Sequence, residues 1–258
     1  MDTYDKSVLG HEVPGELERL RRLEALADPL TRKTLDRIGM TSTWRCLDVG
    51  AGAGSVARHL AQRATAGHVT ATDLDTRFLP LDVPNLLPLK HDACVDDFPA
   101  ESFDLIHARL VLDHLPDRES TLRRMIGWLA PGGWLYLGGL DVSTSLNSPY
   151  RPVLDGVSRF ASTMTAQMGT DLRFTRRATS LMRSMGLRHV GIDCAPIILG
   201  DRGEGDRFFG IMLKQFQTAL PASDQEAHAE LRTATEWLAA PTGVEIGGLF
   251  TAAWGQRG

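Results

Sequence analysis

Cysteine is scarce in this 258-residue sequence, and positive charge is not in excess. The three cysteines, Cys46, Cys94 and Cys194, are an odd number and lack the close pairing of a zinc site. They predict buried thiols in a reducing cytosol and no bound metal. A formal net charge of -4 leaves no concentrated basic surface of the kind that phosphate binding requires, so nucleic acid is disfavoured as a partner.

Long hydrophobic runs are also missing. No stretch approaches the ~20 apolar residues that span a membrane, and residues 1–15 show no basic-then-apolar signal pattern. We therefore expect a cytoplasmic protein with no membrane partner. The 43% of hydrophobic and 23% of charged residues are ordinary for a globular protein, and the length suits one large unit with insertions or a small cap.

Strand-like and helix-like segments alternate along the chain. Residues 15–39 have leucines near helical spacing and predict one amphipathic helix, or two that are broken at Pro29. Strands are predicted at 44–50, 68–75, 86–92, 103–108 and 134–141, with helices at 54–64 and 119–130. Further helices are predicted at 172–186, 205–220 and 223–240, and further strands at 187–199 and 248–256. Such alternation predicts an open α/β sheet of parallel strands joined by crossover helices.

Three glycines at every second position follow the first strand, in the stretch DVGAGAG. Gly50, Gly52 and Gly54 expose backbone N–H groups where a parallel strand ends and a helix begins, which favours a ligand site over a plain tight turn. A dinucleotide fingerprint would place its third glycine at position 55, where Ser55 stands. Asp48, two residues before the first glycine, would repel a pyrophosphate and suits a ligand that bears an ammonium group.

Aspartates also end the next two predicted strands. Asp73 ends the second strand, where a carboxylate can accept hydrogen bonds from both hydroxyls of a ribose. Asp92, beside the small Ala93, ends the third strand, where it can meet an adenine amino group. Each of these residues alone is common in turns and helix caps. Three acids on three successive strands together predict a nucleoside cofactor.

Residues 44–141 resemble the class I methyltransferases that use S-adenosylmethionine. LDVGAGAG is similar to their glycine loop, VTATD to the acidic end of their second strand, HDA to their adenine contact, and FDLIHARLVLDHLPD with LAPGGWLYL to their fourth and fifth strands. The resemblance implies a Rossmann-like seven-stranded sheet in the order 3-2-1-4-5-7-6, with the seventh strand antiparallel, helices on both faces and a helical cap. The flanking segments are similar to a small-molecule branch that is common in actinobacteria.

The resemblance also implies a domain division and a cofactor site. It predicts an N-terminal helical lid at 1–40 and an S-adenosylmethionine-binding domain at 41–258, with a cap insertion at about 142–170. Carried onto this sequence, the residues expected to bind the cofactor are Tyr4, Asp48, Gly50, Ala51, Gly52, Gly54, Asp73, Leu74, Asp92, Ala93, Arg109 and Leu110.

Methyl transfer from a sulfonium chiefly requires a nucleophile held in line at about 3 Å, and a base helps when that nucleophile is a hydroxyl. The catalytic candidates are His107, His114 and Asp141, with Asp113 beside them. Each has a structural alternative: His107 as a core histidine, His114 as a packing residue, Asp113 as a solvated helix residue and Asp141 as a cap.

The implied activity is transfer of a methyl group to an O, N or C nucleophile of a small organic metabolite in bacterial secondary metabolism, with S-adenosylhomocysteine as product. Bulky apolar side chains after residue 142 would either line an apolar substrate cavity or form core: Phe160, Met164, Met168, Phe174, Phe208, Phe209, Met212 and Phe216. A cofactor that is bound without transfer, while the pocket promotes a cyclisation or rearrangement, is one alternative. A nonenzymatic binding protein is another, and homodimerisation is left open.

Overall fold

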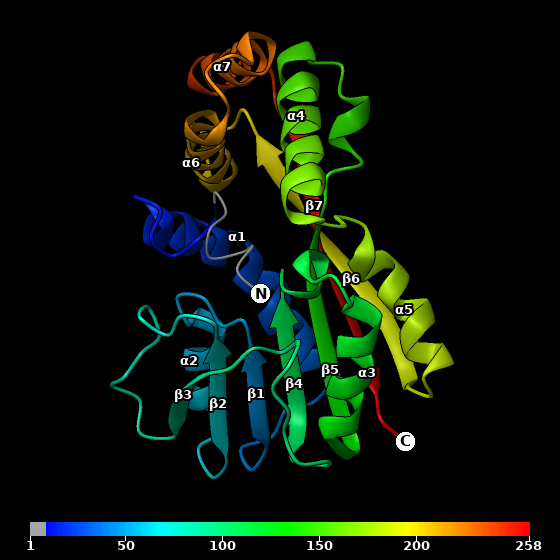
Figure 1. Ribbon diagram of the computed structural model, residues 1–258. Coiled ribbons are helices and arrows are strands. Elements are labelled where there is room, and N and C mark those ends of the chain that lie inside the picture. Colours follow the sequence, from blue (N-terminus) through cyan, green and yellow to red (C-terminus); the bar gives the residue numbers. More distant parts are fainter. Residues whose placement is uncertain (1–8) are drawn as a thin grey trace. The chain divides into compact units, whose positions relative to one another are not determined.

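The computed structural model describes residues 9–258, and its strands form a seven-stranded sheet in the order β3-β2-β1-β4-β5-β7-β6 (Figure 1). The strands are β1 (Arg45–Val49), β2 (His68–Asp73), β3 (Leu86–Lys90), β4 (Phe103–Arg109), β5 (Leu129–Asp141), β6 (Arg188–Leu199) and β7 (Glu245–Gln256). The α-helices are α1 (Glu16–Arg37), α2 (Ser55–Arg63), α3 (Arg118–Trp128), α4 (Arg151–Met168), α5 (Phe174–Ser184), α6 (Glu204–Ala219) and α7 (Gln225–Ala239). Two short 3₁₀ helices, η1 (Leu112–His114) and η2 (Ser145–Asn147), follow β4 and β5.

The first five strands are parallel, and the last strand in sequence, β7, runs against β5. β1 pairs in parallel with β2 and β4, β2 with β3, and β4 with β5. The backbone N–H of Arg257 donates to Gly133 O, while Thr251 Oγ1 donates to Gly139 O, so later residues of β5 face earlier residues of β7. β7 is therefore antiparallel to β5, and the predicted fold class is confirmed.

Both faces of the sheet bury apolar side chains against helices. On one face, Cys46 and Leu105 pack with side chains of α1 and α2, among them Leu35 and Leu60. On the other face, the alternate strand residues pack with side chains of α3 and α5, including Leu47, Ile106, Leu122, Met125, Phe174 and Met182. This alternation follows from the period of two along a strand, and it is the pattern of a sheet that is covered on both sides.

The chain divides into two compact units whose boundaries cut across several elements. The sheet unit comprises residues 28–139, 173–194 and 251–258. Among the described residues, the helical unit comprises 9–27, 140–172 and 195–250, and it contains α4, α6 and α7. The cap insertion expected at about 142–170 falls within the helical unit, which also takes in the later segment 195–250. That later contribution was not foreseen from the sequence.

Helix α1 continues through Pro29 and ends at Arg37, so the single-helix alternative is the observed one. Proline removes one backbone hydrogen bond and strains the preceding turn. The helix nevertheless buries Leu30 and Leu35, which are 4% and 0% exposed. Burial of this apolar face offsets the local cost of the proline.

The three cysteines have different environments, which corrects the expectation that all are buried. Cys46 is buried, Cys94 is half-buried and Cys194 on β6 is exposed. Burial raises the pKa of Cys46 to about 12, with smaller contributions from Asp104 and Asp48. Among the described residues, no helix combines the length and apolar character needed to cross a membrane.

These environments predict stepwise thiol labelling of the folded protein. Only the thiolate reacts, so Cys46 stays protonated and inert near neutral pH, while the exposed Cys194 reacts first with a disulfide reagent. We expect Cys194→Ser to remove the fast phase of the reaction and denaturant to be needed before Cys46 is titrated. A fast phase that persists in Cys194→Ser would contradict this assignment, and Cys94→Ser serves as the matched control.

Candidate functional site

The loop between β1 and α2 has three glycines in the left-handed region, with φ of 63° at Gly50, 59° at Gly52 and 83° at Gly54. Residues with a Cβ rarely adopt this conformation. At two positions space is lacking as well. A Cβ on Gly50 would lie 2.3 Å from Val111 Cγ2, and one on Gly54 would lie 2.4 Å from Pro80 Cδ. The three alternating glycines are therefore required by the backbone conformation of this loop, which residues with a Cβ rarely adopt.

Asp73, at the carboxyl end of β2, ties this loop to the neighbouring strand. The backbone N–H of Gly52 donates to Asp73 Oδ2 at 2.8 Å, and Ala51 N–H donates to Thr72 O at 2.9 Å. Asp73 Oδ1 accepts from the backbone N–H of Asp75 at 3.3 Å. The predicted ribose-binding carboxylate and the predicted glycine loop thus lie side by side at the carboxyl edge of the sheet.

Asp48 and His107 form a buried pair on adjacent strands. They are opposite each other in the β1–β4 register, and His107 Nδ1 lies 2.7 Å from Asp48 Oδ1. His107 also stacks on Tyr136 of β5, with ring centroids 4.7 Å apart, and the Tyr136 hydroxyl hydrogen-bonds to Thr31 Oγ1 of α1 at 3.1 Å. The imidazole is therefore fixed from two sides.

Arg109 and Leu110 lie at the carboxyl end of β4, as predicted, and Arg109 has a partner that the sequence did not reveal. Its Nη1 donates to Asp28 Oδ1 of α1 at 3.0 Å and to Thr31 Oγ1 at 3.3 Å. Asp28 Oδ1 also accepts from Ser55 Oγ, at the start of α2, at 2.9 Å. Leu110 has a φ of 57°, which marks a sharp turn of the chain directly after β4.

The segment after β3 is folded around Asp92. Its Oδ1 accepts from the backbone N–H of Cys94 at 2.8 Å, which closes a local turn. Arg124 of α3 donates to the carbonyl oxygens of Ala93 and Cys94 at 3.1 and 3.0 Å. Asp92 and Ala93 are both 8% exposed, and Leu74 after β2 is half-buried. The residues expected to meet the cofactor nucleoside therefore follow adjacent strands of one sheet unit.

The three catalytic candidates lie in three different environments. His107 is 2% exposed and is engaged with Asp48, whereas His114 is half-buried at the end of η1. Asp141 belongs to the helical unit, where its Oδ1 accepts from the backbone N–H and the hydroxyl of Ser143 at 2.8 and 2.5 Å. These two bonds close a local turn directly after β5. Tyr4 lies outside the described residues.

Sequence reasoning missed a buried histidine beside the predicted nucleoside site. His91, directly before Asp92, is 8% exposed and stacks on Phe98 with ring centroids 4.5 Å apart. Trp128 lies edge-on to the same imidazole. Burial lowers the pKa of His91, so the neutral form is favoured near neutral pH. Asp28, Tyr136 and Thr31 were also missed, because no local motif marks them and only the packing of α1 and β5 brings them to the site.

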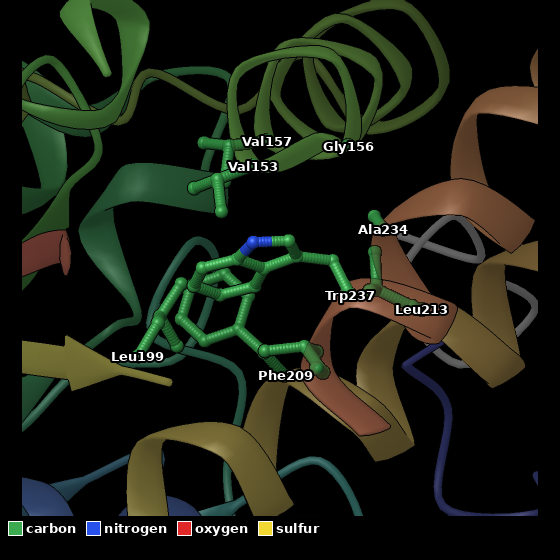
Figure 2. Close-up of a pocket in the computed structure, with 9 residues that line it drawn as sticks. Val153, Gly156, Val157, Leu199, Phe209, Leu213, Ala234 and Trp237 are labelled. Carbon is green, nitrogen blue, oxygen red and sulfur yellow. The ribbon is translucent and has the colours of Figure 1, made fainter. Parts of the chain in front are cut away.

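The helical unit contains a small apolar cavity lined by residues of α4, β6, α6 and α7. Figure 2 shows Val153 and Val157 pointing toward the rings of Trp237 and Phe209. Most of the bulky side chains proposed to line a substrate cavity are buried core: Phe160, Met164, Phe174, Phe208, Met212 and Phe216. Phe209 is also buried, but it lines the small apolar cavity. Met168 is half-buried. The structure thus supports the core alternative for that set.

The sheet order, the reversed β7 and the glycine loop after β1 together define the class I methyltransferase fold. Residues 47–137 match the family described as methyltransferase domain. Over these residues the chain is therefore similar to the methyltransferase domains of the class I, S-adenosylmethionine-dependent family.

Named relatives match this chain over only part of their own length, which is about half for the first curated one. Methyltransferase str2 of Strobilurus tenacellus is 36% identical over 128 residues, which are 46% of this chain and 45% of that protein. The phosphoethanolamine N-methyltransferase 2 of Haemonchus contortus, solved with phosphomonomethylethanolamine and S-adenosylhomocysteine, has a TM-score of 0.59 at 16% identity, over 95% of this chain and 58% of its own. The [4+2]-cyclase SpnF has a TM-score of 0.56 at 16% identity, over 90% and 80%. The two structural similarities show the fold alone.

The glycine loop yields a stability prediction. Gly54→Ala places a Cβ in the left-handed region and against Pro80, so we expect the free energy of unfolding to fall by about 1–3 kcal/mol. Gly127→Ala in α3, where a Cβ meets nothing within 4 Å, is the matched control and should stabilise by about 0.5–1 kcal/mol. Denaturant unfolding of both variants measures the difference. Equal effects would show that the backbone path after β1 imposes no constraint.

Proposed function

We propose that this protein is a methyltransferase that takes the methyl group of S-adenosylmethionine and transfers it to a small organic substrate. The observation that carries the proposal is the hydrogen bond from Gly52 N–H to Asp73 Oδ2, which joins the left-handed glycine loop to the acidic end of β2. That arrangement lies inside residues 47–137, which match the methyltransferase domain.

The residues present fit such a cofactor. The loop of Gly50, Gly52 and Gly54 has no side chains that would keep a ligand from the backbone, and the N-terminus of α2 follows it directly. Asp73 would hold the ribose, with Leu74 beside it, and Asp92 with Ala93 would face the adenine. Asp48 and the loop would hold the amino-acid part. A cationic sulfonium ligand also matches a site that carries carboxylates on three adjacent strands.

When bound, S-adenosylmethionine would supply a methyl group: its carbon–sulfur bond would break with the electron pair left on sulfur, while an electron pair of the substrate formed the new bond. The contribution of this chain is then mainly to hold donor and acceptor in line. A hydroxyl substrate must also lose its proton. His107 is poorly placed to accept that proton, because its imidazole is buried and engaged with Asp48.

A small substrate is supported by charge and composition. The net charge of -4 does not suit a polyanionic nucleic acid, and the helical unit is built around apolar side chains of α4, α6 and α7. The neighbour from Haemonchus contortus was solved with phosphomonomethylethanolamine, a small molecule. We also propose that the substrate is an organic metabolite of bacterial secondary metabolism and that its nucleophile is an O, N or C atom. We further propose that the protein works in the cytoplasm.

Asp73→Asn tests the cofactor site. The amide keeps the size of the side chain and an acceptor for Gly52 N–H, but it removes the charge that strengthens hydrogen bonds from ribose hydroxyls. We expect the dissociation constant for S-adenosylhomocysteine, measured by calorimetry, to rise about 10- to 100-fold. Asp82→Asn changes an exposed carboxylate of the same unit and should leave binding unchanged. Equal affinities of Asp73→Asn and the unaltered protein for S-adenosylhomocysteine would show that Asp73 does not contact the cofactor.

Methyl-labelled S-adenosylmethionine and a panel of candidate metabolites test the reaction itself. Transfer yields S-adenosylhomocysteine and a product that carries the label in equal amounts. A substrate that is converted to an isomer of unchanged mass, with the label left on the cofactor, would overturn methyl transfer in favour of a cyclisation or rearrangement. Failure of the unaltered protein to bind either S-adenosylmethionine or S-adenosylhomocysteine would overturn the proposal altogether.

A further inference from the structure

A row of polar residues crosses the sheet on the face that packs against α1 and α2. Asp48, His107 and Tyr136 are paired residues on β1, β4 and β5. Two residues earlier on β1 and β4, Cys46 and Leu105 belong to the apolar core of the same face. The row lies at the end of the strands where the glycine loop begins, and Asp48, His107 and Tyr136 are 1%, 2% and 1% exposed.

The hydrogen bonds of His107 indicate which proton it carries. Its Nδ1 lies 2.7 Å from Asp48 Oδ1, while Nε2 is buried and has no hydrogen-bond partner among the described residues. An imidazolium would leave a buried N–H donor unsatisfied at Nε2, which is costly. The neutral tautomer with its proton on Nδ1 leaves only an acceptor lone pair at Nε2, places no buried cation there, and donates to Asp48. The stack on Tyr136, whose hydroxyl is held by Thr31, keeps the ring in this orientation.

A neutral His107 leaves the negative charge of Asp48 uncompensated. Asp48 Oδ2 is buried and has no hydrogen-bond partner among residues 9–258. An isolated buried carboxylate is unfavourable unless a partner of opposite charge approaches it. Asp48 lies two residues before Gly50, next to the loop that would hold the amino-acid part of the cofactor. The ammonium group of that part is a cation of the required charge.

We propose that His107 is a positioning residue that acts through Asp48. By donating from Nδ1 to Oδ1, it fixes the carboxylate and keeps its negative charge beside the glycine loop, where that charge favours a ligand with an ammonium group. His107 on this view takes no proton from the substrate. The inference rests on the proposed function, because it assigns a role within the same cofactor site.

Two ligands isolate the ammonium group. Decarboxylated S-adenosylhomocysteine carries the ammonium group without the carboxylate, and 5′-methylthioadenosine carries neither. The ratio of their dissociation constants, measured by calorimetry, reports the preference for the ammonium. We expect the unaltered protein to prefer the ammonium-bearing ligand by about 10-fold or more, since a hydrogen bond to a charged group contributes that much.

Two substitutions of His107 separate hydrogen bonding from bulk. His107→Leu keeps an apolar side chain of similar size but no donor, and should reduce the preference to about 2-fold or less while binding of 5′-methylthioadenosine changes little. His107→Asn retains an N–H near the position of Nδ1 and should keep most of the preference. His59→Leu on α2, a half-buried histidine of the same unit, is the matched control and should keep all of it.

Asp48→Asn provides a second route if His107→Leu fails to fold. It removes the charge at nearly constant size and should abolish the preference to the same extent. The inference is overturned if His107→Leu weakens both ligands equally, if His107→Asn loses as much as His107→Leu, or if Asp48→Asn retains the preference. Failure of the unaltered protein to bind any of the adenosine ligands overturns the proposed function instead, so the two failures are distinguishable.

Discussion

The register in which β1 pairs with β2 and β4 decides where the chemistry of this protein lies. Asp48 is opposite Ala71 of β2 and opposite His107 of β4. Polar side chains therefore begin near the carboxyl end of β1. A shift of one residue would turn Asp48 toward the face that packs against α3 and α5, where Leu47 and Val49 now lie. The glycine loop would then begin without its acidic residue.

The loop after β1 depends on this register for its own shape. Gly52 N–H reaches Asp73 only because β1 and β2 end at the same edge, and Ala51 N–H continues the pairing onto Thr72 O. The left-handed glycines let the chain turn from strand to helix within five residues, between Val49 and Ser55. The pairing of β1 with β2, the glycine turn and the charge of Asp73 therefore all determine the position of the Gly52 N–H.

The two compact units use their side chains in different ways. The sheet unit concentrates carboxylates at one edge, whereas the helical unit packs apolar side chains of α4, α6 and α7 around a small cavity. Fold similarity extends over nearly all of the chain, but the family match is confined to residues 47–137 of the sheet unit. The family match therefore covers the part of the sheet unit in which the cofactor chemistry is proposed.

The amino-acid sequence by itself determined the order of the elements, the glycine loop and the acids near the carboxyl ends of β1, β2 and β3. These features are local: strand and helix periods, glycine turns and residues at strand ends can all be read within short windows. The tertiary structure alone decided that Asp28 contacts Arg109, that Tyr136 stacks on His107, and that Asp141 is buried beside Ser143 in the helical unit. Those contacts join residues far apart in the chain, or depend on how buried a side chain becomes, and no short window contains either kind of information. For the same reason the phenylalanines and methionines after residue 142 could be assigned to core rather than to a pocket only once the helices were packed.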